Sequence, residues 1–315
     1  MQLNRRGDPG WSPNLIAILG PTAVGKSALA IQLAREFRGE IISADSRTVY
    51  CGMNIGTAKP TPDEQALAPH HLIDVVQPNE TFTLADYQHR AYTTIAEIHA
   101  RGNIPFLVGG TGLYVRAVLE GLSIPRVAPN LARREELEKL DAEFLYARLQ
   151  TLDPLAASRI EPRNKRRVIR AIEVCESSGQ PISELQKLNA PNYRVLRIGL
   201  TMPRVQLYER INARVDAMIT AGLVDEVRGL LERGYAPDLP SMSGLGYRQI
   251  VDYLQGKTSL EEAVRVLKRD TRRFVHHQYT WFRLNDPRIV WFDVSVDVTE
   301  SIRQTARRFL EGGLQ

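Results

Sequence analysis

The chain has little cysteine and lacks any long apolar run. Its two cysteines, Cys51 and Cys175, have no further Cys or His at ligand spacing, which argues against a disulfide framework or a zinc site. The first apolar run, Leu15 to Leu19, is far shorter than a membrane span. The stretch before it, Met1 to Pro13, is polar and unlike a secretory signal. We therefore expect a cytoplasmic protein with no membrane partner.

Acidic residues are fewer than basic ones. The sequence has 41 Lys and Arg against 36 Asp and Glu, which gives a net charge of +5. Clustered positive charge can neutralise nucleic-acid phosphates and release their counterions, so an RNA partner is allowed. Charge alone does not establish such a partner, because many basic proteins bind no nucleic acid. The length of 315 residues suggests about two domains.

Short apolar runs alternate with amphipathic segments, a pattern that predicts a parallel sheet with crossover helices. The helix before Gly102 begins at a capping box formed by Thr83 and Asp86. The expected strands are Leu15 to Leu19, Glu40 to Ser43, Leu72 to Val76, Ile104 to Val108, Val195 to Leu200 and Ile289 to Val294.

The character of the chain changes from about Val127 to Pro191. This stretch is charged and helical, without strand patterns, and is broken at prolines and at Gly179-Gln180-Pro181. We therefore predict a helical insertion at 127–191, with the core split into a first part at 1–126 and a second part at 192–315.

A long helix is expected near the C-terminus. It begins at a Ser259/Glu262 capping box, and its predicted apolar stripe runs through Val264, Leu267, Phe274 and Trp281. Arginine and lysine crowd its other faces. That charge either is an ordinary solvated face or contacts a polyanion.

A complete P-loop pattern follows the first strand and opens a helix. Backbone N–H groups of such a loop surround a phosphate, Lys26 reaches a terminal phosphate, and Ser27 can ligate Mg²⁺. No group in the loop recognises a base, so a kinase of a small metabolite remains open. The fold class predicted is α/β, a P-loop NTPase-like parallel sheet core with a helical insertion domain and C-terminal helices. The phosphate-binding residues are Gly20, Pro21, Thr22, Ala23, Val24, Gly25, Lys26 and Ser27.

Asp45 and Thr111 follow two of the expected strands, where ligands bind in parallel sheets. Asp45 can accept a proton from an incoming nucleophile, although an aspartate at this place can also cap a turn. Thr111 stands where ordinary NTPases often carry a magnesium-binding carboxylate. A threonine there argues against ATP hydrolysis.

Several segments together resemble the tRNA dimethylallyltransferases, in that family's order and spacing, over nearly the whole chain. The resemblance implies that dimethylallyl diphosphate is the donor, with Mg²⁺. The implied acceptor is adenosine 37 in tRNAs reading codons that begin with U, which becomes N6-isopentenyladenosine. The segments are 20–27, Asp45 to Tyr50, Asn54 to Pro60, His70 to Asp74, Gly109 to Tyr114, Arg167 to Glu173, Gly244 to Gln249 and Thr280 to Arg283.

The resemblance also implies roles for individual residues. Asp45 is the implied base, and Thr111 and Arg214 are the implied diphosphate contacts. From the sequence alone, Arg214 and Arg210 are an i,i+4 pair that could simply be solvated. We expect the adenine of the anticodon stem-loop to be flipped towards the diphosphate. The implied tRNA contacts are Asp45, Ser46, Arg47, Thr48, Thr111, Arg133, Arg166, Arg167, Arg170, Ser243, Gly246, Tyr247 and Arg248.

Three alternatives stay open. An adenylate isopentenyltransferase would share the loop and the base but prenylate a free nucleotide, and a small-molecule kinase would not need the basic insertion. An RNA-binding protein that uses its P-loop only as a switch would do no chemistry. We expect a monomer.

Overall fold

The computed structural model describes residues 12–125 and 127–313. Most of the polar stretch Met1 to Pro13 lies outside the described residues. The chain divides into two compact units, one made of Met1–Val115 with Asn192–Gln315 and the other of Arg116–Pro191. The expected insertion at 127–191 falls within the second unit. No helix in the described part of the chain has the length and apolar character needed to cross a bilayer.

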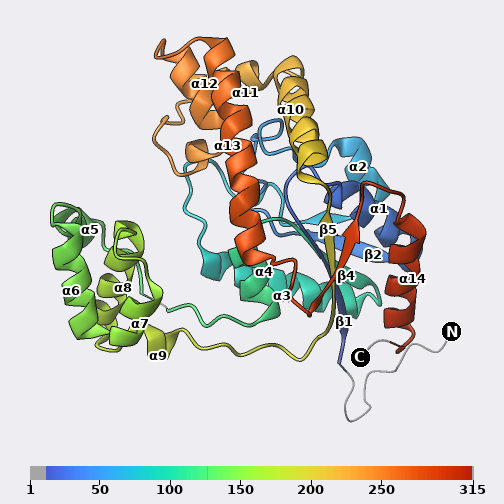
Figure 1. The fold of residues 1–315 in the computed structure, drawn as a ribbon, viewed down its shortest axis with the longest axis horizontal. Helices are drawn as coiled ribbons and strands as arrows, with labels where there is room; N and C mark the ends of the chain where they lie inside the picture. Colours follow the sequence, from blue (N-terminus) through green and yellow to red (C-terminus); the bar gives the residue numbers. More distant parts are fainter. Residues whose placement is uncertain (1–11, 126, 314–315) are drawn as a thin grey trace. The chain divides into compact units, whose positions relative to one another are not determined.

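The first unit is built on a six-stranded sheet (Figure 1). Its order is β3-β2-β4-β1-β5-β6, and all neighbouring pairs run parallel, which confirms the predicted parallel core. Because β1 lies between β4 and β5, the crevice at the carboxyl ends of these strands is a natural ligand site. The strands are β1 (Asn14–Leu19), β2 (Gly39–Ser43), β3 (His70–His71), β4 (Ile104–Val108), β5 (Arg194–Thr201) and β6 (Ile289–Asp293).

The third strand was predicted at the wrong place. Instead of running through Leu72 to Val76, β3 is His70–His71, paired with Ile41 and Ile42 of β2. Leu72 has φ 60° and Asp74 has φ 51°, and backbone in this left-handed region cannot continue an extended strand. Val76 forms only an isolated bridge with Tyr50.

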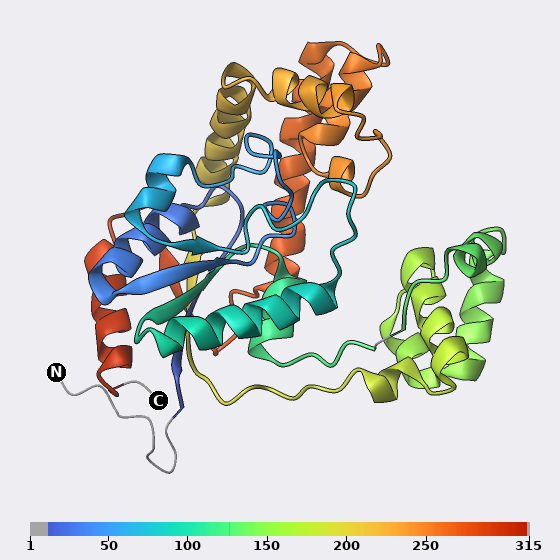
Figure 2. The same cartoon turned by 180° about the vertical axis from the view of Figure 1, so that it is seen from behind.

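Helices cover both faces of the sheet. Ile16 and Ile18 of β1 share an apolar core with α1 and α14, while α3 covers the opposite face (Figure 2). As predicted, α3 begins at the Thr83/Asp86 capping box. The helices of this unit are α1 (Lys26–Phe37), α2 (Pro62–Leu67), α3 (Leu84–Ala100), α10 (Arg204–Thr220), α11 (Leu223–Glu232), α12 (Tyr247–Leu254), α13 (Leu260–Trp281) and α14 (Thr299–Leu310), with a 3₁₀ turn at Ser241–Ser243. A further helix, α4 (Gly112–Leu119), includes the boundary between the units.

The helices α10 to α13 bring a second apolar core to the first unit. Val215, Leu223, Ile250 and Leu267 pack together there. The predicted stripe on α13 was partly wrong, because Phe274 and Trp281 are exposed. The buried side chains of α13 are Ala263, Leu267, Val275 and Gln278.

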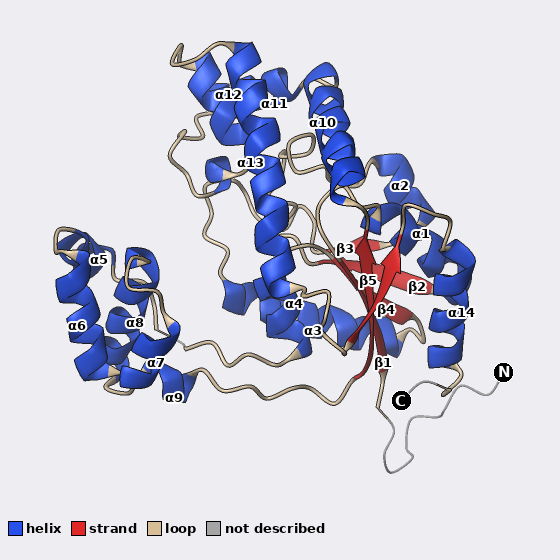
Figure 3. Cartoon of the chain, in the orientation of Figure 1, coloured by secondary structure: helices blue, strands red, loops and turns tan. Residues whose placement is uncertain are grey.

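Helices joined by loops make up the described residues of the second unit, with an isolated bridge between Leu122 and Leu188, and Figure 3 shows the strands confined to the first unit. Pro154 starts α7, and Gly179, at φ 69°, caps the end of α8, as the breaks in the sequence pattern predicted. Leu145, Leu149, Val168 and Ile172 belong to its apolar core. Its helices are α5 (Leu131–Glu138), α6 (Ala142–Leu152), α7 (Pro154–Arg159), α8 (Lys165–Ser178) and α9 (Ile182–Leu185).

Candidate functional site

The P-loop connects β1 to α1 at the carboxyl end of the central strand. Gly20 has φ 138°, and a Cβ there would lie 2.4 Å from the carbonyl oxygen of Leu200, so only glycine fits. The first turn of α1 contains no acidic residue. The positive end of this helix is therefore not offset by a local carboxylate, an arrangement that favours an anion.

Lys26 is held against the loop that precedes it. Its Nζ donates hydrogen bonds to the carbonyl oxygens of Gly20 at 3.0 Å and Pro21 at 2.6 Å. Burial lowers the pKa of Lys26 to about 7, and the positive charge of Arg214 contributes to this decrease. The negative charge of Asp45 acts in the opposite direction. Burial also lowers the pKa of Arg214, and the negative charge of Asp45 offsets part of this decrease. Two cations and one carboxylate thus form a single electrostatic site.

Asp45 and Thr111 lie on two connected turns after β2 and β4. The Thr111 N–H donates to the Ala44 carbonyl at 3.1 Å, and Thr111 Oγ1 accepts the Ser46 N–H at 3.1 Å. Asp45 Oδ1 accepts the Arg47 N–H at 2.8 Å. Asp45 therefore caps a turn and also belongs to the charged group with Lys26 and Arg214. The turn fixes its backbone beside Thr111.

Two segments predicted to bind tRNA contact each other in the first unit. Arg47 donates to the Pro240 carbonyl at 2.7 Å and to Ser243 Oγ at 3.2 Å. Thr48 is buried and its hydroxyl lies 2.9 Å from Ser43 Oγ. Arg248 stays exposed while pairing with Asp270 at 3.0 Å. Arg47 thus connects the turn after β2 to Ser243, and Ser243 and Arg248 are the exposed residues of the second segment.

Tyr247 lies within the apolar core rather than at this surface. It is 1% exposed, and its hydroxyl donates to the Glu226 carboxylate at 2.7 Å. The same carboxylate accepts the backbone N–H groups of residues 54, 55 and 56. Gly246, at φ 93°, caps the start of α12, whose first residue is Tyr247. Tyr247 and Glu226 therefore fix the loop at 54–56.

The four arginines of the second unit that were predicted to bind tRNA differ in their partners. Arg133 pairs with Glu136 and Glu176, at 2.7 and 3.1 Å. Arg170 pairs with Glu173, whose side chain is fully buried. Arg166 and Arg167, on the first turn of α8, are exposed and have no ion pair within the described residues. Of these four arginines, they are the two whose charge is not offset by a carboxylate of the described residues.

Gln278 is a site residue that the sequence did not reveal. It is 3% exposed in the last turn of α13. Its Oε1 accepts the Thr22 N–H of the P-loop at 2.8 Å, and its Nε2 donates to the Gly110 carbonyl at 3.1 Å. Its only signal in the sequence was its place just before the family segment that begins at Thr280.

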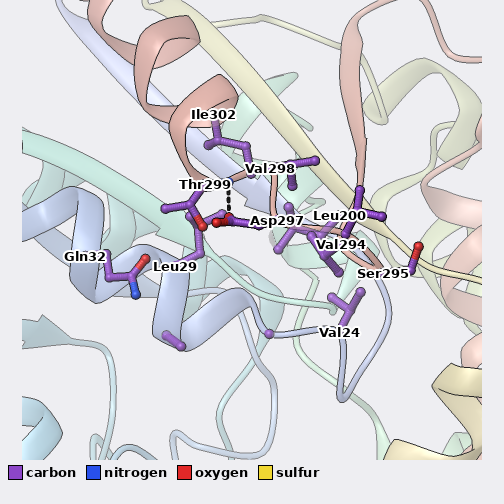
Figure 4. Close-up of a pocket in the computed structure, with 13 residues that line it drawn as sticks. Val24, Leu29, Gln32, Leu200, Val294, Ser295, Asp297, Val298, Thr299 and Ile302 are labelled. Carbon is purple, nitrogen blue, oxygen red and sulfur yellow. Dashed lines mark hydrogen bonds between the residues drawn. The ribbon is translucent and has the colours of Figure 1, made fainter.

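A cavity of about 390 Å³ lies on the α1 side of the P-loop (Figure 4). Val24 and Leu29 line it on one side, and residues 294–299, between β6 and α14, on the other. Asp45, Thr111 and Arg214 are not among its lining residues. The cavity is therefore separate from the residues that were predicted to carry the chemistry.

The described residues contain no cluster of three or more His, Cys, Asp or Glu that could hold a metal alone. Ser27 is exposed at the start of α1. A single hydroxyl suits Mg²⁺, which usually completes its coordination with water and substrate phosphates. The residues present therefore fit a magnesium ion that arrives with a phosphate ligand.

A P-loop on a parallel sheet, with cations and a carboxylate at neighbouring strand ends, is typical of phosphate-binding α/β proteins. Comparison with known proteins narrows this class. The family model described as IPP transferase matches residues 48–285, and the chain belongs to this family.

Relatives and solved structures agree with this family. A tRNA dimethylallyltransferase of Roseiflexus sp. (strain RS-1) is 59% identical over 273 residues, covering 85% of this chain and 90% of the relative. A tRNA dimethylallyltransferase of Dehalococcoides mccartyi is 48% identical over 310 residues, covering 97% and 95%. The tRNA isopentenylpyrophosphate transferase of Bacillus halodurans is 45% identical with a TM-score of 0.72, covering 95% and 97%. A eukaryotic dimethylallyltransferase described as acting on tRNA has a TM-score of 0.83 at 28% identity, covering 96% and 80%.

Proposed function

We propose that this protein transfers the dimethylallyl group of dimethylallyl diphosphate to N6 of adenosine 37 in tRNAs that read codons beginning with U. The observation that carries the proposal is the P-loop that holds Lys26, together with the connected turns that fix Asp45 and Thr111 at the ends of β2 and β4. Membership of the IPP transferase family and the named relatives support the same reaction.

In the proposed reaction, N6 of the adenine attacks the first carbon of the prenyl chain while the bond from that carbon to the diphosphate oxygen breaks. Asp45 accepts the proton that the amino group loses. Its carboxylate is suited to this role because the turn bond to the Arg47 N–H involves one oxygen, Oδ1. The second oxygen remains for the substrate.

As the diphosphate departs, negative charge develops on the oxygen that was bonded to the prenyl carbon, and the site must stabilise this charge. Lys26, Arg214 and the P-loop amides stabilise that charge in a preorganised site. The Thr111 hydroxyl contributes a further donor, because the one acceptor that it meets among the described residues, Ser46 Oγ, lies at a long 3.5 Å. Ser27 would hold Mg²⁺ here, and the ion would supply further positive charge to offset that of the leaving group.

We propose that the tRNA is bound by residues on both units. Arg47, Ser243 and Arg248 on the first unit and Arg166 and Arg167 on α8 carry the phosphate contacts. Tyr247 is not included, because its side chain is buried. We also propose that the protein acts as a monomer in the cytoplasm.

The decisive experiment combines the purified protein with Mg²⁺, dimethylallyl diphosphate and unmodified anticodon stem-loop RNA, followed by nucleoside mass spectrometry. We expect a dimethylallyl mass gain at adenosine 37, and its severe loss in Asp45→Ala with RNA binding retained. Prenylation of free AMP alone would indicate an adenylate isopentenyltransferase. ATP turnover on a small acceptor would indicate a kinase, and an Asp45→Ala variant with full function would indicate an RNA-binding switch.

A further inference from the structure

We propose that Gln278 is a positioning residue that sets the spacing between the P-loop and the Gly109-Gly110-Thr111 turn. This inference rests on the proposed function, because it assumes that both segments bind the diphosphate. Gln278 comes from α13, far along the chain from either segment. Its primary amide is the group that hydrogen-bonds to both of them.

The two hydrogen bonds of Gln278 require one side chain to act as an acceptor and as a donor. Oε1 accepts from Thr22 N–H at 2.8 Å, and Nε2 donates to the Gly110 carbonyl at 3.1 Å. A primary amide supplies one acceptor and one donor on the same carbon, whereas a carboxylate supplies acceptors only. A glutamate at 278 would therefore face the Gly110 carbonyl with a second acceptor.

The amide of Gln278 lies close against the backbone of the turn. A Cβ at Gly110 would lie 2.1 Å from Nε2 of Gln278. The close approach therefore needs the glycine, and it brings the side chain against the backbone next to Thr111. Thr111 is in turn bonded to Ser46, beside Asp45. A displacement of the amide would therefore shift the P-loop through Thr22 and the turn that carries Thr111 through Gly110.

The bond to Thr22 also orients the start of the P-loop. The next residue, Ala23, has φ 64°, and Lys26 closes back onto the carbonyls of Gly20 and Pro21. With the Thr22 N–H committed to Gln278, the peptide between Pro21 and Thr22 has both of its polar groups bonded to protein. The loop is thus preorganised before a diphosphate arrives, which lowers the ordering cost of binding.

The test compares Gln278→Met, which keeps the length and loses both bonds, with Gln278→Glu, which keeps only acceptors. Gln249→Met is the matched control. Gln249 is also 3% exposed and also makes two bonds, accepting from Gly246 N–H and donating to Asp270. Neither of its partners belongs to the P-loop or the Thr111 turn.

Calorimetry with inorganic pyrophosphate and Mg²⁺, thermal melting, RNA binding and single-turnover transfer are measured for all four proteins. We expect each Gln278 variant to weaken pyrophosphate binding about tenfold, with RNA affinity unchanged. Gln278→Glu should be at least as impaired as Gln278→Met. Gln249→Met should lose a similar amount of thermal stability but keep its pyrophosphate affinity.

The outcomes separate this inference from the proposed function. If the wild-type protein binds no pyrophosphate and transfers no prenyl group, the proposed function fails. If the wild type does both, and Gln278→Met melts early like Gln249→Met but binds pyrophosphate normally, Gln278 has only a packing role. Full activity of Gln278→Glu would also overturn the positioning role, because that variant cannot donate to Gly110.

Discussion

Thr111 Oγ1 accepts the backbone N–H of Ser46 at 3.1 Å, so the turns after β4 and β2 are connected by a side chain. The residue that we propose as a diphosphate contact therefore also fixes the turn that presents Asp45. Loss of its hydroxyl should affect both parts of the site.

For Thr111→Ala we expect single-turnover transfer to slow about a hundredfold, the scale for removal of one preorganised donor. Thr111→Ser keeps the hydroxyl and should recover most of the rate. Rapid-quench measurement with saturating RNA tests this. Equal rates for Thr111→Ala and the wild type would remove Thr111 from the mechanism.

Lys26 gives a pH-dependent signature in folding stability. Its pKa is about 7 in the folded chain against the ordinary value of 10.5. Between these values the unfolded chain binds more protons, so the contribution of Lys26 makes stability rise with pH across that window. Below pH 7 the full cost of the buried ammonium remains.

Lys26→Met should therefore be more stable than the wild type, with the largest gain below about pH 7 and little gain near pH 10.5. Denaturant midpoints at several pH values measure the difference. The same variant should lose pyrophosphate binding. A gain in stability that does not depend on pH would show that the ammonium is not the cause.

Arg166 and Arg170 on α8 should respond differently to replacement by alanine. Arg166→Ala should weaken RNA binding and reduce the slope of log affinity against log salt by about 1, with folding unchanged. Arg170→Ala removes a partner of the buried Glu173 and should cost about 2 kcal/mol of folding stability. Salt-dependent RNA binding and urea unfolding of both variants test this contrast. A lowered melting temperature in Arg166→Ala, or a stable Arg170→Ala, would contradict it.

Tyr247→Phe separates packing from RNA contact. The variant removes the hydroxyl that donates to Glu226 and should destabilise the first unit by about 1–2 kcal/mol. RNA affinity should stay at the wild-type value, whereas Arg248→Ala, which alters an exposed cation, should weaken it. Fluorescence-anisotropy binding and thermal melting provide both readouts. Weakened RNA binding in well-folded Tyr247→Phe would return Tyr247 to the RNA surface.

The sheet could be predicted from the sequence where apolar runs end at clear turns. β4 was predicted at Ile104 to Val108, its observed bounds, and β1 within one residue. β3 was misplaced because its end depends on left-handed backbone at Leu72 and Asp74, conformations that no local pattern required.

The site divides in the same way. The spacing of glycine and lysine identified the P-loop, because all of its phosphate-binding groups lie within one short stretch of sequence. Gln278 was not found, because its burial arises only when α13 packs on the P-loop and the Gly110 turn. Arg133 and Arg166 are the same residue type on similar helices, and only the positions of Glu136 and Glu176 distinguish a paired cation from an exposed one.

The position of β5 in the sheet determines the order in which the chain can fold during synthesis. β1 pairs with β5 along its full length, yet the whole second unit, Arg116–Pro191, is translated between them. That unit is one continuous stretch of chain that folds into several short helices, and helical units with local contacts fold quickly. It can therefore be complete while one edge of β1 still lacks its partner. The central strand, which leads into the P-loop, gains its second neighbour only after the ribosome has passed residue 201.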